Sequence, residues 1–304
     1  MPPDLNDITD QISLTPFQAL GIPIALVGAV FLALGAQFQS RGVSKVEQRS
    51  GIEASGGLTR AHLLALLSRP SWVAGTLMLG LAIVLQLISL GIAPLIVVQP
   101  LGAVALVITA VVNARMTKTP IDRLSIRAIS LCVGGVGLFV LFAALFAKET
   151  PISNRQLVII LVILAVVLLL FGVSYAYLRR RFKAIAYILG AGVLYGFVAT
   201  LAKVVIVRIR TGDFELLTLV CVLALLAAAA LGAYFVQNAY ASGPPDLVIA
   251  GLTVVDPLVA VGIGVIVLGE ASEAPLYAVI AFVVSAAVAI FGVFQLAKFH
   301  PQIK

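Results

Sequence analysis

GPPDLVIAGLTVVDPLVAVGIGVIVLGE, residues Gly243–Glu270, is apolar and long enough to cross a bilayer, which takes about 20 residues. Asp256 stands near its middle, and Pro257 follows at once. A carboxylate at that depth is costly and rare unless it has a partner or a task. Asp is a good N-cap and Pro suits the first helical position, so the pair predicts a helix that breaks at Asp256 and restarts at Pro257. Interrupted helices near the midplane form the sites of many secondary transporters, and we expect the other helices to surround this break.

The composition of the whole chain agrees with a membrane location. Of the 304 residues 62% are hydrophobic and 11% are charged, and the mean hydropathy is +1.15, which excludes an ordinary soluble domain. The apolar residues form continuous runs of about 20, whereas a β-barrel would alternate in segments of about ten. We therefore predict an all-α polytopic membrane protein with nine spans: Phe17–Ser40, Ser71–Gly91, Pro94–Ala114, Leu124–Phe146, Gln156–Leu178, Ala184–Val207, Glu215–Ala241, Leu247–Leu268 and Pro275–Ala297.

Basic residues gather on one side of this topology. Fifteen Lys and Arg fall in the segments after spans one, three, five and nine, and four fall on the other side. By the positive-inside rule the first side is cytoplasmic, which puts the N-terminus outside and the C-terminus inside a plasma (inner) membrane. The net charge of +7 is then a topology signal and does not indicate nucleic-acid binding.

An approximate internal repeat divides the chain. QLISLGIAPLIVVQPLGAVALVI (Gln86–Ile108) is similar to QNAYASGPPDLVIAGLTVVDPLVAVGI (Gln237–Ile263), since each has a Gln, a turn with Pro, and an apolar stretch broken by a polar residue and Pro. Four spans on each side of one connecting span give two inverted repeats, as in alternating-access transporters. The predicted parts are an extracytoplasmic tail (1–16), a first repeat (17–146) with a cytoplasmic loop (41–70), a connecting helix (147–183), a second repeat (184–297) and a cytoplasmic tail (298–304).

A family resemblance follows from two stretches. PSWVAGTLMLGLAIVLQLISLGIAPLIVVQPLGAV (Pro70–Val104) and VVDPLVAVGIGVIVLGE (Val254–Glu270) resemble the drug/metabolite transporter superfamily of the EamA type. Within it the chain is most similar to the NIPA-like magnesium-transporter branch, through Trp72, Gly75, the pair Ala93-Pro94 and the run Pro100-Leu101-Gly102. The resemblance implies nine spans, inverted repeats and transport, with magnesium as one expected substrate.

Several polar residues within the spans are candidates for binding a substrate or a coupling ion. Asp256 is the main one; the alternative is that it only caps a helix break. Lys203 either extends outward to the membrane interface, which we favour, or pairs with a substrate anion or with Asp256. Amide side chains often form hydrogen bonds between helices, and we favour Gln99 and Gln86 as cavity residues because of their repeat positions. Gln37 and Tyr195 are weaker candidates, and the expected helix breaks are at Pro94, Pro100 and Pro257.

Other classes of function find little support in the sequence. The chain has no GxxxxGK[ST] motif, and its histidines, His62 and His300, lie outside the spans. Cys132 and Cys221 lie inside apolar runs and suit core positions. We therefore expect no enzyme, no cofactor and no nucleic-acid partner, while a metal remains open. The expected partners are the lipid bilayer and a small-molecule or ion substrate, and a homodimer is left open.

The predicted function is secondary active transport of the drug/metabolite type by alternating access. A small metabolite, drug-like compound or lipid-linked molecule would bind near Asp256 with Gln99 opposite, with the proton gradient as a candidate driving force. The alternative is a magnesium or other divalent-cation carrier, although Mg²⁺ prefers octahedral oxygen coordination and the spans offer one carboxylate. A second alternative is a non-transporting membrane partner whose Asp256 is only a cap.

Overall fold

The computed structural model describes residues 14–50, 66–117, 123–149, 151–178, 184–242 and 245–299, and this part of the chain is helical apart from short connections. Nine of its helices are long and apolar enough to cross a membrane, with α6 and the start of α7 together forming one of the nine; this confirms the predicted span count. The helices are α2 (Pro16–Ala19), α3 (Gly21–Ser50), α5 (Pro70–Ile92), α6 (Leu95–Leu101), α7 (Ala103–Thr117), α8 (Arg123–Phe146), α9 (Asn154–Leu178), α10 (Ala184–Thr211), α11 (Leu216–Ser242), α12 (Pro245–Ile266) and α13 (Leu276–Phe299).

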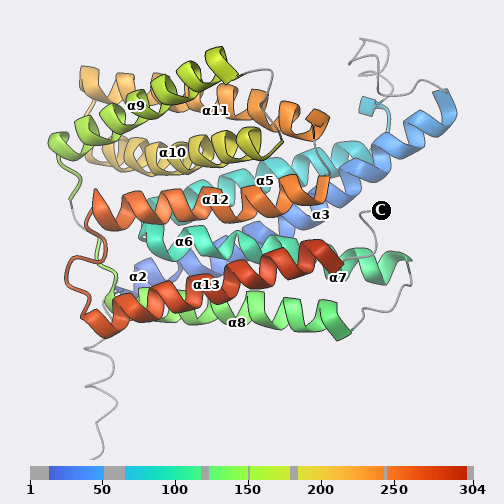
Figure 1. Ribbon diagram of the computed structural model, residues 1–304, viewed down its shortest axis with the longest axis horizontal. Coiled ribbons are helices and arrows are strands. Elements are labelled where there is room, and N and C mark those ends of the chain that lie inside the picture. The colour runs from blue at the N-terminus through green and yellow to red at the C-terminus, as the bar shows by residue number, and fades with distance from the viewer. Residues whose placement is uncertain are drawn as a thin grey trace, which may run out of the picture.

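The helices lie roughly along one direction and pack as neighbouring pairs (Figure 1). Helix α3 packs along α5, α10 packs along α11 and α12, and α8 packs along α13. Helices α8 and α13 lie at one margin of the bundle, and α9 and α11 lie at the opposite margin. Helices α6 and α12 contact each other between these groups, so the two stretches that carry Gln99 and Asp256 meet inside the bundle.

Glycines allow the closest of these helix contacts. A Cβ at Gly75 of α5 would lie 2.5 Å from the backbone nitrogen of Gln39 on α3, and a Cβ at Gly135 of α8 would lie 2.5 Å from that of Ala289 on α13. Both distances are shorter than the non-bonded carbon–nitrogen contacts that proteins show, so a larger residue would push the helices apart. Small residues at such crossings are how membrane helices associate when lipid offers no hydrophobic driving force.

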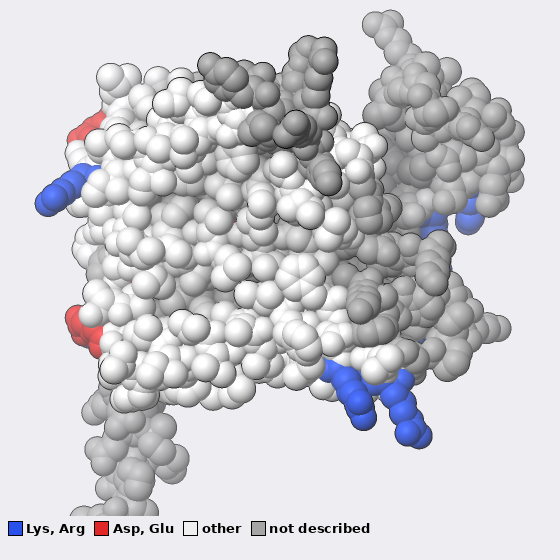
Figure 2. Space-filling model, viewed as in Figure 1, with Lys and Arg blue, Asp and Glu red and all other residues white. Residues whose placement is uncertain are grey.

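Charged residues gather at the two ends of the bundle (Figure 2). The acidic end is where α8, α10 and α12 finish, and it carries Glu149, Asp213, Glu215, Glu270 and Glu273. The basic end is where α3 and α7 finish and α8 begins, and it carries Arg41, Lys45, Arg69, Arg115, Arg123 and Arg127. The broad band between the ends is uncharged on the face in Figure 2, as expected for a surface that faces hydrocarbon.

The predicted break at Asp256 is wrong. Helix α12 runs through Asp256 and contains Pro257 in its interior. Proline removes one backbone donor, the N–H that would reach the carbonyl of Thr253, but membrane helices tolerate this because neighbouring groups compensate. The other two predicted breaks lie at real interruptions, since Pro94 stands between α5 and α6, and α6 ends one residue after Pro100.

The predicted loop 41–70 also begins later than expected. Helix α3 continues to Ser50, past the predicted end of the span at Ser40. Lys, Glu, Gln and Arg in this extension are good helix formers, so the helix continues beyond the apolar run. Residues 51–65 lie outside the described part of the chain, and with them much of the predicted loop.

Candidate functional site

Asp256 lies at a cavity of about 660 Å³, here called the Asp256 cavity, which opens to the surface of the bundle beside the exposed side chains of Ile83 and Leu87. Helices α3, α5, α6, α10, α11 and α12 all contribute to its wall. Its polar side chains are those of Asp256, Gln86, Gln99, Thr253, Tyr195 and Tyr240. The rest of the wall consists of Gly28, Ala29, Leu32, Ala82, Ile83, Leu87, Gly102, Ile249, Leu252 and Pro257. A cavity of this size is in the range of small-molecule sites, which are mostly apolar with a few polar groups.

The carboxyl group of Asp256 is not engaged as a cap. Its Oδ1 atom is buried and has no hydrogen-bond partner among the described residues. Helix α12 continues past Asp256, so the turn there presents no free N–H groups for the carboxylate to cap. Tyr195 on α10 is close enough to Asp256 for an electrostatic interaction between the two side chains. The carboxyl group is therefore directed at the cavity with its hydrogen-bonding capacity unused.

The structure brings four of the predicted site residues together and separates two. Asp256, Gln86, Gln99 and Tyr195 line the same cavity. Gln37 is absent from the lining and has a partner of its own. Lys203 also lies away from the cavity, toward the acidic end. Whether the four lining residues bind a solute remains a prediction.

The expected exposure of Lys203 at the interface and its pairing with Asp256 are wrong, while its pairing with a substrate anion stays a prediction. Its side chain is 1% exposed, so it does not extend to the interface, and its partners are Glu149 and Glu270 instead of Asp256. Lys203 Nζ lies 3.0 Å from Glu149 Oε1 and 3.2 Å from Glu270 Oε1, and it donates a hydrogen bond of 2.9 Å to the carbonyl of Ala93. We call Lys203, Glu149 and Glu270 the acidic-end cluster.

Glu270 fastens the start of α6. Its two carboxylate oxygens accept the backbone N–H groups of Leu95 and Ile96, each at 2.8 Å, in the first turn of that helix. Those N–H groups have no partner within the helix and carry its positive end, so an ionised carboxylate suits the position. Gly269, with φ of 74°, makes the turn that leads from α12 to Glu270. Glu270 is 2% exposed. Its backbone is also fixed, because its carbonyl accepts the N–H of Lys148 at 2.8 Å.

The acidic-end cluster joins segments from most of the chain. Lys203 belongs to α10, Glu270 follows α12 and Glu149 follows α8. Glu149 also accepts a hydrogen bond of 3.0 Å from Gln18 of α2. Arg210 of α10 adds a second tie by donating to the carbonyl of Gly91, at the end of α5. These contacts hold the acidic end of the bundle together beside the start of α6.

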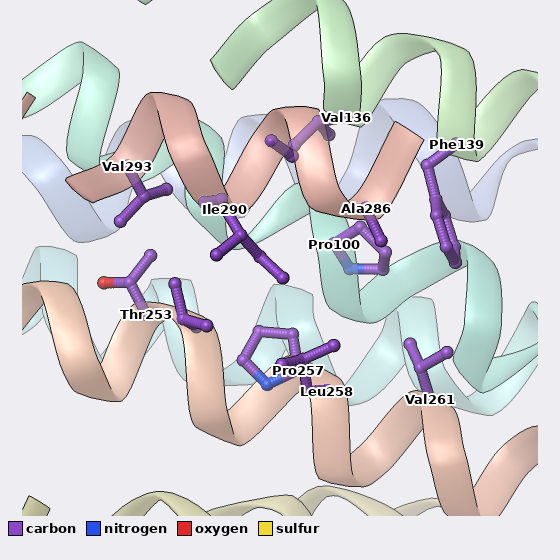
Figure 3. A pocket seen from close by; sticks show the side chains of 13 residues that line it. Pro100, Val136, Phe139, Thr253, Pro257, Leu258, Val261, Ala286, Ile290 and Val293 are labelled. Carbon is purple, nitrogen blue, oxygen red and sulfur yellow. The ribbon is translucent and has the colours of Figure 1, made fainter. Parts of the chain in front are cut away.

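A second, smaller cavity lies across the α6–α12 contact. Its volume is about 60 Å³, and its wall is apolar except for Thr253. Figure 3 shows Pro100, Thr253 and Pro257 directed into it, with Ile290 and Val293 of α13 opposite. Thr253 and Pro257 line both cavities, so one face of α12 separates them. Pro100 and Pro257 thus border a cavity, and this space accommodates the backbone distortion that a proline causes in a helix.

The fold and the charge pattern define a polytopic helical membrane protein with a cavity at Asp256. The chain is 28% identical over 253 residues to an uncharacterized protein of Corynebacterium glutamicum, which covers 83% of this chain and 85% of that protein. No family model matches the chain, and no solved structure matches it.

Proposed function

We propose that this protein is a secondary active transporter of the drug/metabolite type that moves a small solute across the membrane by alternating access. The observation that carries this proposal is the Asp256 cavity: about 660 Å³ inside a nine-span bundle, with an unpartnered carboxyl oxygen at its wall. Ionisable residues inside membrane segments mark solute or proton pathways, because their burial is otherwise unfavourable. The solute binds between the two halves of the chain, beside Asp256 and Gln99.

The pairing of helices supports two inverted repeats. In the first half α3 packs on α5 and on α7; in the second half α10 packs on α11 and on α12. Helices α6 and α12, which hold equivalent places in the two halves, contact each other, and so do α8 and α13. Helix α9 connects the halves and is the least buried of the nine spans. Such a correspondence between halves is typical of alternating-access transporters.

The contacts at the two ends of the bundle support one conformational state of an alternating-access cycle. The Asp256 cavity extends to Tyr240, near the end of α11, and to Ile249, near the start of α12. Both residues lie on the side of the cavity that faces the basic end of the bundle. At the other end the acidic-end cluster binds α10, the start of α6 and the loop after α12 together. We therefore interpret the structure as the state that is closed at the acidic end.

The charge pattern supports an orientation. Lys and Arg predominate at the basic end, and the positive-inside rule places that end in the cytoplasm. The protein then lies in a plasma (inner) membrane, with the N-terminus outside and the C-terminus inside. In this orientation the Asp256 cavity extends toward the cytoplasm.

Reconstitution tests the function directly. Purified protein in liposomes is compared with Asp256→Asn, with Asp213→Asn at the acidic end as the matched control. A pH-sensitive dye reports proton flux while candidate metabolites and drug-like compounds are added, and a magnesium-sensitive dye reports Mg²⁺ entry. Uptake that Asp256→Asn abolishes and Asp213→Asn preserves supports the transporter. Magnesium uptake with the same dependence favours the divalent-cation carrier, and a protein that moves none of these favours the non-transporting membrane partner.

A further inference from the structure

The Asp256 cavity has one acidic side chain and no basic one in its described lining. Asp256 is the one Asp, Glu, Lys, Arg or His among the residues that line it, all within the described part of the chain. Its Oδ1 atom lacks a partner. A buried carboxylate of this kind is stabilised by a cation or a proton. An anionic solute would find no basic side chain in the described lining and would be repelled by Asp256 in its ionised form, so the cavity disfavours that class.

The nearby cations of the protein already have partners. Lys203 is bound to Glu149, Glu270 and the carbonyl of Ala93. Arg208 pairs with Glu215 at 2.9 Å, and its other nitrogens donate to Thr218 and Asn154. Both cations lie toward the acidic end of α10, beyond Tyr195. Neutralisation of Asp256 therefore has to come from outside these cations, as a bound proton or as a positive charge on the solute that replaces the proton.

The rest of the wall indicates what else the solute carries. Leu32, Ile83, Leu87, Ile249 and Leu252 present aliphatic surface to the cavity. Two aromatic rings, those of Tyr195 and Tyr240, also line it. Aromatic faces attract cations and pack well against apolar bodies, which a small hydrated ion does not exploit.

Magnesium fits this wall less well than an organic cation. Mg²⁺ takes six oxygen ligands at about 2.1 Å, and one carboxylate would leave half of its charge uncompensated. A cavity of about 660 Å³ with a largely aliphatic wall is far larger than such a site. We propose that the Asp256 cavity binds a monovalent organic cation with an apolar or aromatic body, an inference that rests on the proposed function and names its substrate class.

The test separates charge from shape. The full chain in lipid nanodiscs is titrated calorimetrically with phenyltrimethylammonium, with tert-butylbenzene as its neutral carbon isostere, with benzenesulfonate and with MgCl₂, and heats from empty nanodiscs are subtracted. We expect the cation to bind about tenfold or more tightly than its isostere, since Coulombic attraction between its quaternary nitrogen and the Asp256 carboxylate in a partly desolvated site is worth at least that factor. Asp256→Asn should remove this preference, and Tyr195→Leu should weaken cation binding by about two- to fivefold. The control Asp213→Asn should change neither.

Three results would contradict the proposed substrate class. Equal affinity for the cation and the isostere, binding of benzenesulfonate, or Asp256-dependent binding of Mg²⁺ alone would overturn the substrate class. A second measurement separates this failure from failure of the proposed function. In a Cys132→Ala, Cys221→Ala background, Asp256→Cys is treated with a membrane-impermeant maleimide. Modification without cation binding leaves a solvent-accessible cavity and overturns the organic cation; absence of modification as well as binding overturns both proposals.

Discussion

Lys203 and Glu270 lie 67 positions apart in the sequence, yet their side chains meet inside the bundle with Nζ and Oε1 3.2 Å apart. Both side chains are almost fully buried, at 1% and 2% exposure. Glu270 at the same time accepts two N–H groups at the start of α6, the helix that carries Gln99 to the Asp256 cavity. The ion pair and the candidate site are therefore connected through one seven-residue helix.

Glu270→Gln should destabilise the protein strongly. The change leaves Lys203 with Glu149 as its remaining carboxylate and leaves a neutral amide at the start of α6. Breaking a buried pair from one side costs about 3–5 kcal/mol, because the other charge stays buried with fewer partners. Unfolding by SDS in mixed micelles measures the free energy of unfolding. Glu273→Gln is the control, since Glu273 is 65% exposed in its pair with Lys148 and such surface pairs contribute little. Equal losses in the two variants would contradict the assignment of Glu270.

Weakening the acidic-end cluster should open the cavity at that end. In a Cys132→Ala, Cys221→Ala background, Gln86→Cys places a thiol at the wall of the Asp256 cavity. With the cluster intact, we expect an impermeant maleimide to reach this thiol from the basic end alone. Adding Glu149→Gln removes one carboxylate from Lys203 and should allow labelling from the acidic end.

The control for this experiment is Glu215→Gln. Glu215 pairs with Arg208 at the acidic end, within the α10–α11 connection and away from the start of α6. It should lower stability slightly without changing the side from which the thiol reacts. If Glu149→Gln behaves in the same way as Glu215→Gln, the cluster is a structural tie and does not close the cavity.

Hydropathy was enough to predict the nine spans and most of the polar cavity wall. An apolar run of this length crosses a bilayer as an α-helix, because only a helix satisfies its backbone groups within one segment. Asp256, Gln86 and Gln99 stood out as polar residues within such runs. Glu149 and Glu270 were not predicted as site residues because both lie in connections between helices, where carboxylates are ordinary. Their burial depends on how distant segments pack, which a hydropathy pattern does not contain. The run Leu268-Gly269-Glu270, whose glycine makes the turn, was the available signal for Glu270.

The predicted break at Asp256 failed because local sequence does not decide the conformation there. The Asp-Pro pair is compatible both with a helix start and with a proline inside a helix, and the sequence does not distinguish them. Tertiary contacts decide: Val255 and Val259 of α12 pack on Gly192 and Gly196 of α10, on both sides of Asp256. Continuous packing on one neighbour keeps α12 helical across Pro257.

Gly135→Ala should separate α8 from α13. The added Cβ would lie 2.5 Å from the backbone nitrogen of Ala289 and 2.9 Å from the carbonyl oxygen of Ser285, and backbone atoms cannot rotate away. Overpacking of this kind costs about 1–3 kcal/mol. Gly134→Ala is the adjacent control, because its Cβ would meet no atom within 4 Å and alanine is the better helix former. Thermal unfolding in detergent should show a lower Tm for Gly135→Ala and an equal or higher Tm for Gly134→Ala; the same shift in both would show that helix propensity, and not the α8–α13 contact, controls stability here.

Asp256→Ala should leave the free energy of unfolding unchanged or raise it. In the structure α12 continues through this position and Oδ1 has no partner, so alanine removes an unfavourable buried carboxyl group and adds a good helix former. Were Asp256 a structural cap, the same change would cost about 0.5–2 kcal/mol, as cap removal does. SDS unfolding in mixed micelles decides the sign, with Thr253→Ala as the neighbouring reference, since its hydroxyl donates to the carbonyl of Ile249 within the same helix. A variant that is stable but inactive in transport assigns Asp256 to the solute, whereas a clear loss of stability would return it to the role of a cap and remove the main support for the transporter.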